Sequence, residues 1–304
     1  MTTLRPRRAF TLVEMLVVIG IISVLAALLL PAVMIAVRTA RNAAIAVEIN
    51  QLASAIESYK QDKGDYPPNF RDSSVVLRHI RKCFPKADPT YINNFISYAC
   101  IPNSGTVPLT SIDDGEALVF WLSMTDNDPR YPFLSYYNPN GQTPSPKKYY
   151  PFDDTQLADP IATGVANVAD VRACRGKYSK DSYYLYIDSR SYDDTCRING
   201  GNYSDGSNSY AYSEDSTLGS RPYWSATLVT GAAANALNRA KYKPMNATTF
   251  QIICAGQDGD YGGNPTVTTD VKLFPSGLNY DLAGADKDNI TNFSAGKTLG
   301  DSLP

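Results

Sequence analysis

The feature that most constrains this chain is a long apolar segment near its N-terminus, from Phe10 to Val37. A helix of about 20 apolar residues crosses a bilayer, so this segment is long enough to span one. The basic residues Arg5, Arg7 and Arg8 precede it directly. Positive charge before a spanning segment favours a cytoplasmic N-terminus and export of the chain that follows. We therefore predict a single pass through the inner (cytoplasmic) membrane and a periplasmic or extracellular head.

The segment has two simpler interpretations. A secretory signal peptide has a shorter apolar core with its cleavage site after it. A plain membrane anchor accounts for the arginines and the apolar residues, but it does not account for Glu14, the only formally charged residue in the segment. A carboxylate within a spanning helix costs roughly 2.5–3.5 kcal/mol near the centre and less near an end. Cleavage before Phe10 would create a positive amine four residues away, which could meet the Glu14 of a neighbouring subunit.

The residues from Arg8 to Ile22 read RAFTLVEMLVVIGII. This stretch resembles the cleavage and methylation motif of type IV prepilins and type II secretion pseudopilins. The resemblance implies that a prepilin peptidase removes a leader of residues 1–9, cutting between Ala9 and Phe10, and methylates the new amine. It also implies a helical filament of identical subunits in which Phe10 and Glu14 direct assembly. Ala9 departs from the family, which usually has Gly before the cut.

The helix is predicted to continue beyond the membrane, so that residues 10–37 form its transmembrane part and residues 38–63 an amphipathic part. Apolar residues recur there every three or four positions, as on one face of a helix. They are Ile45, Ile49, Leu52, Ile56 and Tyr59. Glu48 is expected elsewhere around the helix. Gly64, with Pro67 and Pro68 beyond it, predicts the end of the helix.

Residues 64–304 are predicted to form an α+β head with a small antiparallel sheet. The turn Lys63–Pro68 resembles the one that follows the long helix of the major pseudopilin, but the head is longer than in a typical pseudopilin and implies an insertion. Short capped helices are expected after Asp72 and Asp113. Strands are expected at Ser182–Asp188, Ala226–Thr230 and Thr248–Cys254. Residues 125–160 are expected to be irregular and exposed, and residues 200–220 to form a loop.

An Asp- and Gly-rich turn near the C-terminus is the candidate metal site. Asp258 and Asp260 alternate with glycines, an arrangement that supplies hard oxygens of the kind calcium needs. The turn also resembles one in the major pseudopilin, where a calcium site lies nearby. The resemblance implies calcium held by Asp258, Asp260 and Asp288. Two further residues that could complete the shell are Asp286 and Asn289. The alternative is a solvated Asp-Gly hairpin.

The chain has five cysteines and no CxxC pair, which gives a structural zinc site little support. In an exported domain, proximity along the sequence favours disulfides between Cys83 and Cys100 and between Cys174 and Cys196. Four half-cystines allow three connectivities. Cys254 lies in an apolar run and is expected to be a buried free thiol.

No active site is predicted. The one histidine, His79, lies in a basic stretch and is expected to be exposed. Adjacent acidic residues such as Asp113 and Asp114, Asp153 and Asp154, or Asp193 and Asp194 are interpreted as caps and solvated turns. No nucleophile elbow or phosphate-binding loop occurs. A net charge of −2 does not favour a nucleic-acid partner.

Three functions remain open from the sequence. The first is a structural subunit of a type II secretion-like pseudopilus that supports protein export. The second is a type IV pilin-like subunit of a surface fibre serving adhesion, motility or DNA uptake. The third is a membrane-anchored binding domain that does not polymerise. For the filament functions, the resemblance implies as partners the peptidase, an assembly platform and other pseudopilins.

Overall fold

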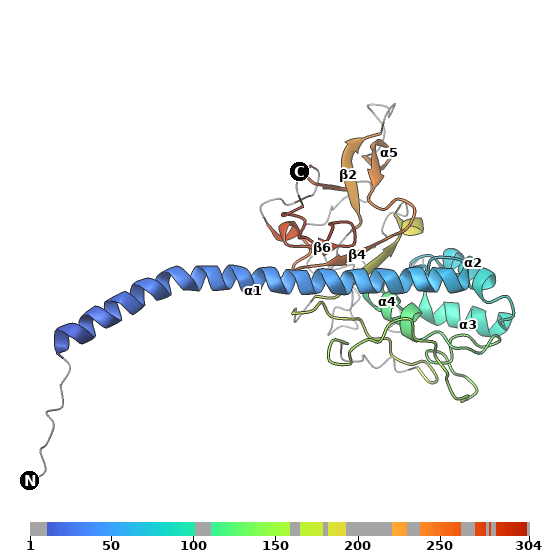
Figure 1. The fold of residues 1–304 in the computed structure, drawn as a ribbon. Helices are drawn as coiled ribbons and strands as arrows, with labels where there is room; N and C mark the ends of the chain where they lie inside the picture. The colour runs from blue at the N-terminus through green and yellow to red at the C-terminus, as the bar shows by residue number, and fades with distance from the viewer. Residues whose placement is uncertain are drawn as a thin grey trace, which may run out of the picture. The chain divides into compact units, whose positions relative to one another are not determined.

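A computed structural model describes residues 11–100, 111–158, 165–178, 182–192, 221–229, 238–262, 271–277, 280 and 284–302. The chain divides into two compact units, Met1–Arg41 and Asn42–Pro304. The first helix, α1, spans Leu12–Lys63 and supplies residues to both units. Figure 1 draws it in blue. The predicted long helix is therefore confirmed over the described residues.

The first unit is the apolar part of α1. Its large side chains are exposed, for example Leu12 at 80%, Leu28 at 70% and Met34 at 71%. Its most apolar window has a mean hydropathy of 2.9 with no residue buried. Within the described ranges α1 is the one helix long and apolar enough to cross a membrane. A helix that is apolar on all sides requires lipid or other apolar helices around it.

The second unit begins where α1 becomes amphipathic. The predicted stripe is confirmed, since Ile45, Ile49, Leu52, Ile56 and Tyr59 are all at most 1% exposed. The expected position of Glu48 was wrong, because its side chain is buried with the stripe. The spacing explains this result: Glu48 follows Ile45 by three residues and precedes Leu52 by four, so all three lie on one helical face.

A sharp turn ends α1. Gly64 has a φ of +79° and its N–H donates to the carbonyl of Lys60 at 2.7 Å. The chain then folds back, and the carbonyls of Pro67 and Pro68 accept hydrogen bonds from Tyr186 and Trp121 respectively. The turn is thus held by groups from distant parts of the head.

Three helices follow, namely α2 (Ser73–Cys83), α3 (Pro89–Ala99) and α4 (Asp114–Ser123). The predicted caps of α2 and α4 are confirmed: Asp72 caps α2, and Asp113 forms a capping box with Glu116. α3 was not predicted from the sequence, although Asp88 followed by Pro89 is a strong helix-start signal. Asp88 accepts a hydrogen bond from the N–H of Tyr91.

The first sheet is antiparallel, with the strand order β1 (Leu185–Asp188), β4 (Phe250–Cys254) and β6 (Ile290–Thr291). Four residue pairs join β1 to β4, and two join β4 to β6. All five residues of β4 are buried. The central strand is therefore covered on both faces. Its one polar side chain, Gln251, is buried and donates to the carbonyl of Tyr223.

The second sheet is mixed, with the order β3 (Tyr242–Pro244), β2 (Tyr223–Leu228) and β5 (Lys272–Phe274). β2 pairs with β3 in antiparallel fashion and with β5 in parallel fashion. The predicted strands correspond to β1, β2 and β4 with shifted ends. The other short elements are η1 (Ser189–Ser191), α5 (Asn238–Lys241) and η2 (Ala285–Lys287).

The segment 125–158 is irregular, as expected. No residue from 138 to 157 is buried, but the expectation of exposure was wrong for residues 132–137, most of which are buried. Phe133 is fully buried and stacks on Phe95 with ring centroids 4.2 Å apart. The buried carboxylate of Asp126 accepts hydrogen bonds from the N–H groups of Ser135 and Ser145. These bonds satisfy backbone groups of a chain without regular structure, which allows the segment to pack into the core.

Candidate processing and assembly site

The N-terminus of α1 carries the candidate assembly residue. Thr11 and Glu14 form a reciprocal cap: the N–H and hydroxyl of Thr11 donate to Glu14 Oε2 at 2.8 and 2.9 Å, and the N–H of Glu14 donates to the Thr11 hydroxyl at 3.2 Å. The pattern Thr-x-x-Glu is the local signal for such a capping box. The other carboxylate atom, Oε1, makes no hydrogen bond within the described part of the chain. Ala9 and Phe10 lie outside the described residues.

The cap gives Glu14 hydrogen-bond partners within its own helix, which the sequence alone did not predict. A carboxylate in an apolar segment needs a partner, and two donors of its own helix N-terminus supply part of that need. The free N–H groups at a helix start carry partial positive charge, which also favours a carboxylate there. Oε1 is left available for a donor from another molecule.

A second candidate region is the turn after β4. Gly256 and Gly262 have φ values of +69° and +78°. A Cβ on Gly256 would lie 2.3 Å from the carbonyl oxygen of Asp288, and one on Gly262 would lie 2.5 Å from the carboxylate of Asp286. Both glycines therefore let the turn lie directly against the segment 284–289.

The acidic residues of this turn bind backbone groups. Asp288 Oδ2 accepts from the N–H of Gln257 at 2.9 Å and of Asp258 at 3.3 Å, and Asp260 Oδ1 accepts from the N–H of Gly262 at 2.8 Å. Burial, and then the neighbouring Asp288, raise the pKa of Asp258 to about 6. The structure thus brings Asp258 and Asp288 together.

The other two residues expected near a calcium ion face elsewhere. Asp286 pairs with Lys272 at 2.6 Å, and the amide nitrogen of Asn289 donates to the carbonyl of Tyr261. Among the described residues, no group of three or more acidic, histidine or cysteine side chains is arranged to hold a metal ion. Calcium binding by Asp258, Asp260 and Asp288 stays a prediction of the sequence.

The cysteines do not form the expected local pair. Cys83 and Cys100 are both free thiols, so the predicted bond between them is not formed. Cys100 is buried after α3, whereas Cys83 Sγ donates to the carbonyl of Lys63. Cys174 is also free, and Cys196 lies outside the described residues. Cys254 is a buried free thiol, as predicted.

His79 is fully buried, so the expectation that it is exposed was wrong. It shares one face of α2 with Val76 and Ile80, and that face packs into the core. Its Nε2 lies 2.9 Å from the hydroxyl of Tyr59, and its Nδ1 lies 3.4 Å from Asp65 Oδ2. Because a carboxylate only accepts, we assign the proton to Nδ1 and the hydroxyl donation to Tyr59.

Burial and neighbouring charges shift the pKa values of the groups around this histidine. The hydrogen bond with His79, followed by the charge of Arg190, lowers the pKa of Asp65 to about 2. Burial lowers the pKa of His79 and raises that of Cys83 to about 11. Cys83 Sγ lies 3.7 Å from His79 Nδ1, the same nitrogen that faces Asp65. A protonated thiol in this position is not an activated nucleophile.

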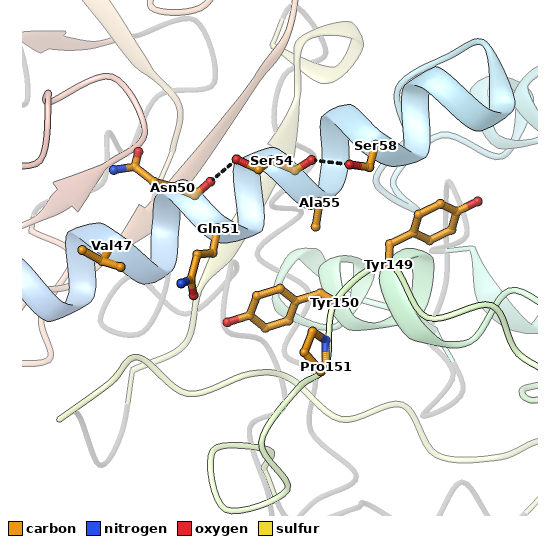
Figure 2. Close-up of a pocket in the computed structure, with 9 residues that line it drawn as sticks. All are labelled: Val47, Asn50, Gln51, Ser54, Ala55, Ser58, Tyr149, Tyr150 and Pro151. Atoms are coloured by element: carbon orange, nitrogen blue, oxygen red, sulfur yellow. Dashed lines mark hydrogen bonds between the residues drawn. The ribbon is translucent and has the colours of Figure 1, made fainter.

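A groove of about 730 Å³ runs along α1 beside residues 149–151. Figure 2 shows Gln51 and Tyr150 facing this groove from its two sides. The hydroxyls of Ser54 and Ser58 donate to carbonyls one turn earlier in α1, at 2.8 and 2.9 Å. This groove was not predicted from the sequence. The signal for it was the row of small polar residues on α1 opposite the apolar stripe.

Comparison with known proteins gives one finding. Residues 4–30 match the family model described as the prokaryotic N-terminal methylation motif. No curated protein and no solved structure matched the chain. The match covers the basic residues, Ala9, Phe10 and the capping pair Thr11 and Glu14. It leads into a long apolar helix followed by a head with small sheets, which is a pilin-like layout. The chain therefore carries the prepilin-type cleavage and methylation signal of the type IV pilin and pseudopilin families.

Proposed function

We propose that this protein is a structural subunit of a type II secretion-like pseudopilus, which assembles after removal of residues 1–9 and supports protein export. The observation that carries the proposal is the exposed apolar part of α1, which begins with the cap of Thr11 on Glu14. An apolar helix of this kind is covered by lipid before assembly and by other subunits within a filament.

The unused oxygen of Glu14 gives this assembly a specific contact. Oε2 already accepts both donors of Thr11, and Oε1 points to no donor within the described part of the chain. A methylated amine on Phe10 of the adjacent subunit would donate to Oε1. Within apolar surroundings such a pair is favourable only when both charges are matched, and it would therefore fix the axial position of each subunit.

A substitution pair separates assembly from helix capping. Glu14→Ala removes the carboxylate, and we expect no filaments although the protein is still inserted and processed. Thr11→Val removes only the hydroxyl of the cap, and we expect filaments to form. Filament yield is measured by shearing and electron microscopy, and the amount of each variant protein in the membrane is the control. Normal filament yield from Glu14→Ala would contradict the proposal.

The turns at both ends of the head favour secretion over a surface fibre. Gly64 to Pro67 and the turn at Asp258 resemble the corresponding turns of the major pseudopilin. The second candidate, a type IV pilin-like fibre subunit, is favoured by the same N-terminal motif. Inactivation of the gene in its host distinguishes the two. Loss of secreted proteins from the medium supports the pseudopilus, and loss of surface fibres with normal secretion supports the pilus.

A further inference from the structure

A lysine is completely enclosed in the head. Lys272, the first residue of β5, is 0% exposed. Its Nζ lies 2.6 Å from Oδ1 of Asp286, which is also 0% exposed, and donates to the carbonyl of Tyr261 at 2.7 Å. It lies 5.0 Å from the centre of the Tyr223 ring. Fully buried lysines are rare in proteins, and this one meets its partners away from solvent.

A buried asparagine meets the same groups. The Nδ2 atom of Asn289 donates to the carbonyl of Tyr261 at 3.1 Å and lies 3.4 Å from Asp286 Oδ1. It also donates to the hydroxyl of Tyr223 at 2.8 Å, and that hydroxyl donates to Asp286 at 2.5 Å. Because Tyr261 and Asp286 offer only acceptors here, the nitrogen of the amide must face them. Its Oδ1 is buried and has no hydrogen-bond partner within the described part of the chain.

The amine and the amide are therefore neighbours. Lys272 Nζ and Asn289 Nδ2 share two acceptor atoms, the carbonyl oxygen of Tyr261 and Oδ1 of Asp286. Two reactants held together in a rigid core react as parts of one molecule, which removes most of the entropic barrier to bond formation. The exclusion of water also prevents hydrolysis of the product.

Asp286 is the group placed to move the proton. Its Oδ1 contacts the lysine nitrogen at 2.6 Å and the amide nitrogen at 3.4 Å, so one carboxylate atom lies between the group that must lose a proton and the group that must gain one. Acid–base catalysis requires this placement within hydrogen-bond reach. Gly262 leaves room for the Asp286 carboxylate in this position, since a Cβ on residue 262 would lie 2.5 Å from that carboxylate.

We propose that Lys272 and Asn289 become joined by an isopeptide bond, with Asp286 carrying the proton. The lysine ammonium gives a proton to Asp286, and the free Nζ attacks Cγ of Asn289. The Nζ–Cγ bond forms and the Cγ–Nδ2 bond breaks. The departing nitrogen takes the proton from Asp286 and leaves as ammonia, and the second proton lost by Nζ passes to Asp286. No oxidant or cofactor is consumed, and the chain loses about 17 Da.

The bond would connect the two sheets. β5 is the edge strand of the second sheet, and Asn289 directly precedes β6, the edge strand of the first. A covalent link between two edges resists their separation when the head is pulled, and it restricts the unfolded chain as a disulfide does. Such a link suits a head that the described cysteines, all free thiols, do not cross-link.

Mass spectrometry of the full-length protein from its native membrane tests the proposal. After reduction and digestion, we expect a branched peptide joining Lys272 to Asn289, about 17 Da lighter than the sum of its two linear parts. Trypsin should not cleave after Lys272, because its amine is acylated. The exposed ion pair of Lys147 and Asp62, at 3.0 Å, is the internal control and should remain unlinked. Linear peptides at Lys272 and Asn289 in the wild-type protein would overturn the proposal.

Two variants assign the roles. Asn289→Ala removes the amide that the lysine nitrogen attacks. Asp286→Asn removes the proton carrier while keeping the size of the side chain. We expect neither to contain the branched peptide. A bond that still forms in Asp286→Asn would overturn the role of Asp286. Loss of about 18 Da in the wild-type protein, with Lys272 joined to Asp286, would overturn the assignment of Asn289. The wild-type mass decides the main question even if a variant does not fold.

Discussion

The hydroxyl of Tyr184 donates a 2.5 Å hydrogen bond to the carboxylate of Glu48 in the interior of the head. The second oxygen of Glu48 accepts from the amide of Gln156 at 3.0 Å. Tyr184 directly precedes β1, so these two bonds tie the buried face of α1 to the first sheet and to the irregular segment before it. A buried carboxylate is tolerated when both of its oxygens are paired in this way.

Glu48→Ala should therefore destabilise the head. The substitution leaves the buried Tyr184 hydroxyl without its acceptor, at a cost of about 1–3 kcal/mol. The half-buried amide of Gln156 loses one acceptor but keeps the carbonyl of Arg175 at 3.5 Å. Glu48→Gln retains an acceptor and the side-chain volume, and is expected to lose less. Urea unfolding monitored by circular dichroism measures the difference. Equal stability of the alanine variant and the wild-type protein would contradict this account.

Processing before Phe10 is expected to be detectable by intact mass. The mature protein should begin at Phe10 and carry one added methyl group of about 14 Da. Ala9→Gly restores the residue usual in the resembling family, and we expect it to increase the fraction of processed chains. A protein that retains Met1–Ala9 in its native membrane would instead favour the simple membrane anchor.

The buried histidine predicts a pH dependence of stability. Burial lowers the pKa of His79 below its ordinary value of 6.5. As the pH falls below that value, the unfolded chain takes up a proton that folded His79 does not, so the free energy of unfolding decreases. His79→Phe removes this proton uptake and keeps a ring against Tyr59. Between about pH 7 and pH 5, the wild-type protein should lose more stability than the variant.

Comparison with the variant is essential for the pH experiment, because other groups act in the opposite direction. Burial raises the pKa of Asp113 to about 7 and the pKa of Asp188 to about 6. Protonation of these two carboxylates therefore stabilises the folded protein as the pH falls. These contributions are common to the two proteins and cancel in the difference. Parallel pH curves for the wild-type protein and His79→Phe would show that His79 does not resist protonation.

Two glycines with similar backbone angles should respond differently to alanine. Gly141 has a φ of +63° with no atom within 4 Å of an added Cβ, whereas Gly262 has a φ of +78° with the Asp286 carboxylate 2.5 Å from it. Alanine in this backbone region costs about 1–2 kcal/mol. Gly141→Ala should lose about this amount and Gly262→Ala clearly more, as measured by urea unfolding. Equal losses would mean that the turn can move away from Asp286.

Much of this fold follows from short-range signals. The apolar run, the stripe that begins at Ile45 and the stop at Gly64 define α1, since helical periodicity is a property of consecutive residues. The Asp caps of α2 and α4 are local for the same reason. The candidate assembly site is equally local: Thr11 and Glu14 are three residues apart and form their cap within one helical turn.

Tertiary structure alone decided which polar side chains are buried. His79, Glu48 and Lys272 belong to types usually found at the surface, yet each meets partners that come from distant parts of the sequence. Asp286 was expected to face a metal ion, and its partner Lys272 lies on a strand that the sequence analysis did not predict. Long-range pairing depends on how the sheets and helices pack around one another, and no spacing along the chain encodes it. The sequence by itself determined the membrane helix and its processing signal, whereas packing of the head determined the buried charges and the lysine–asparagine neighbourhood.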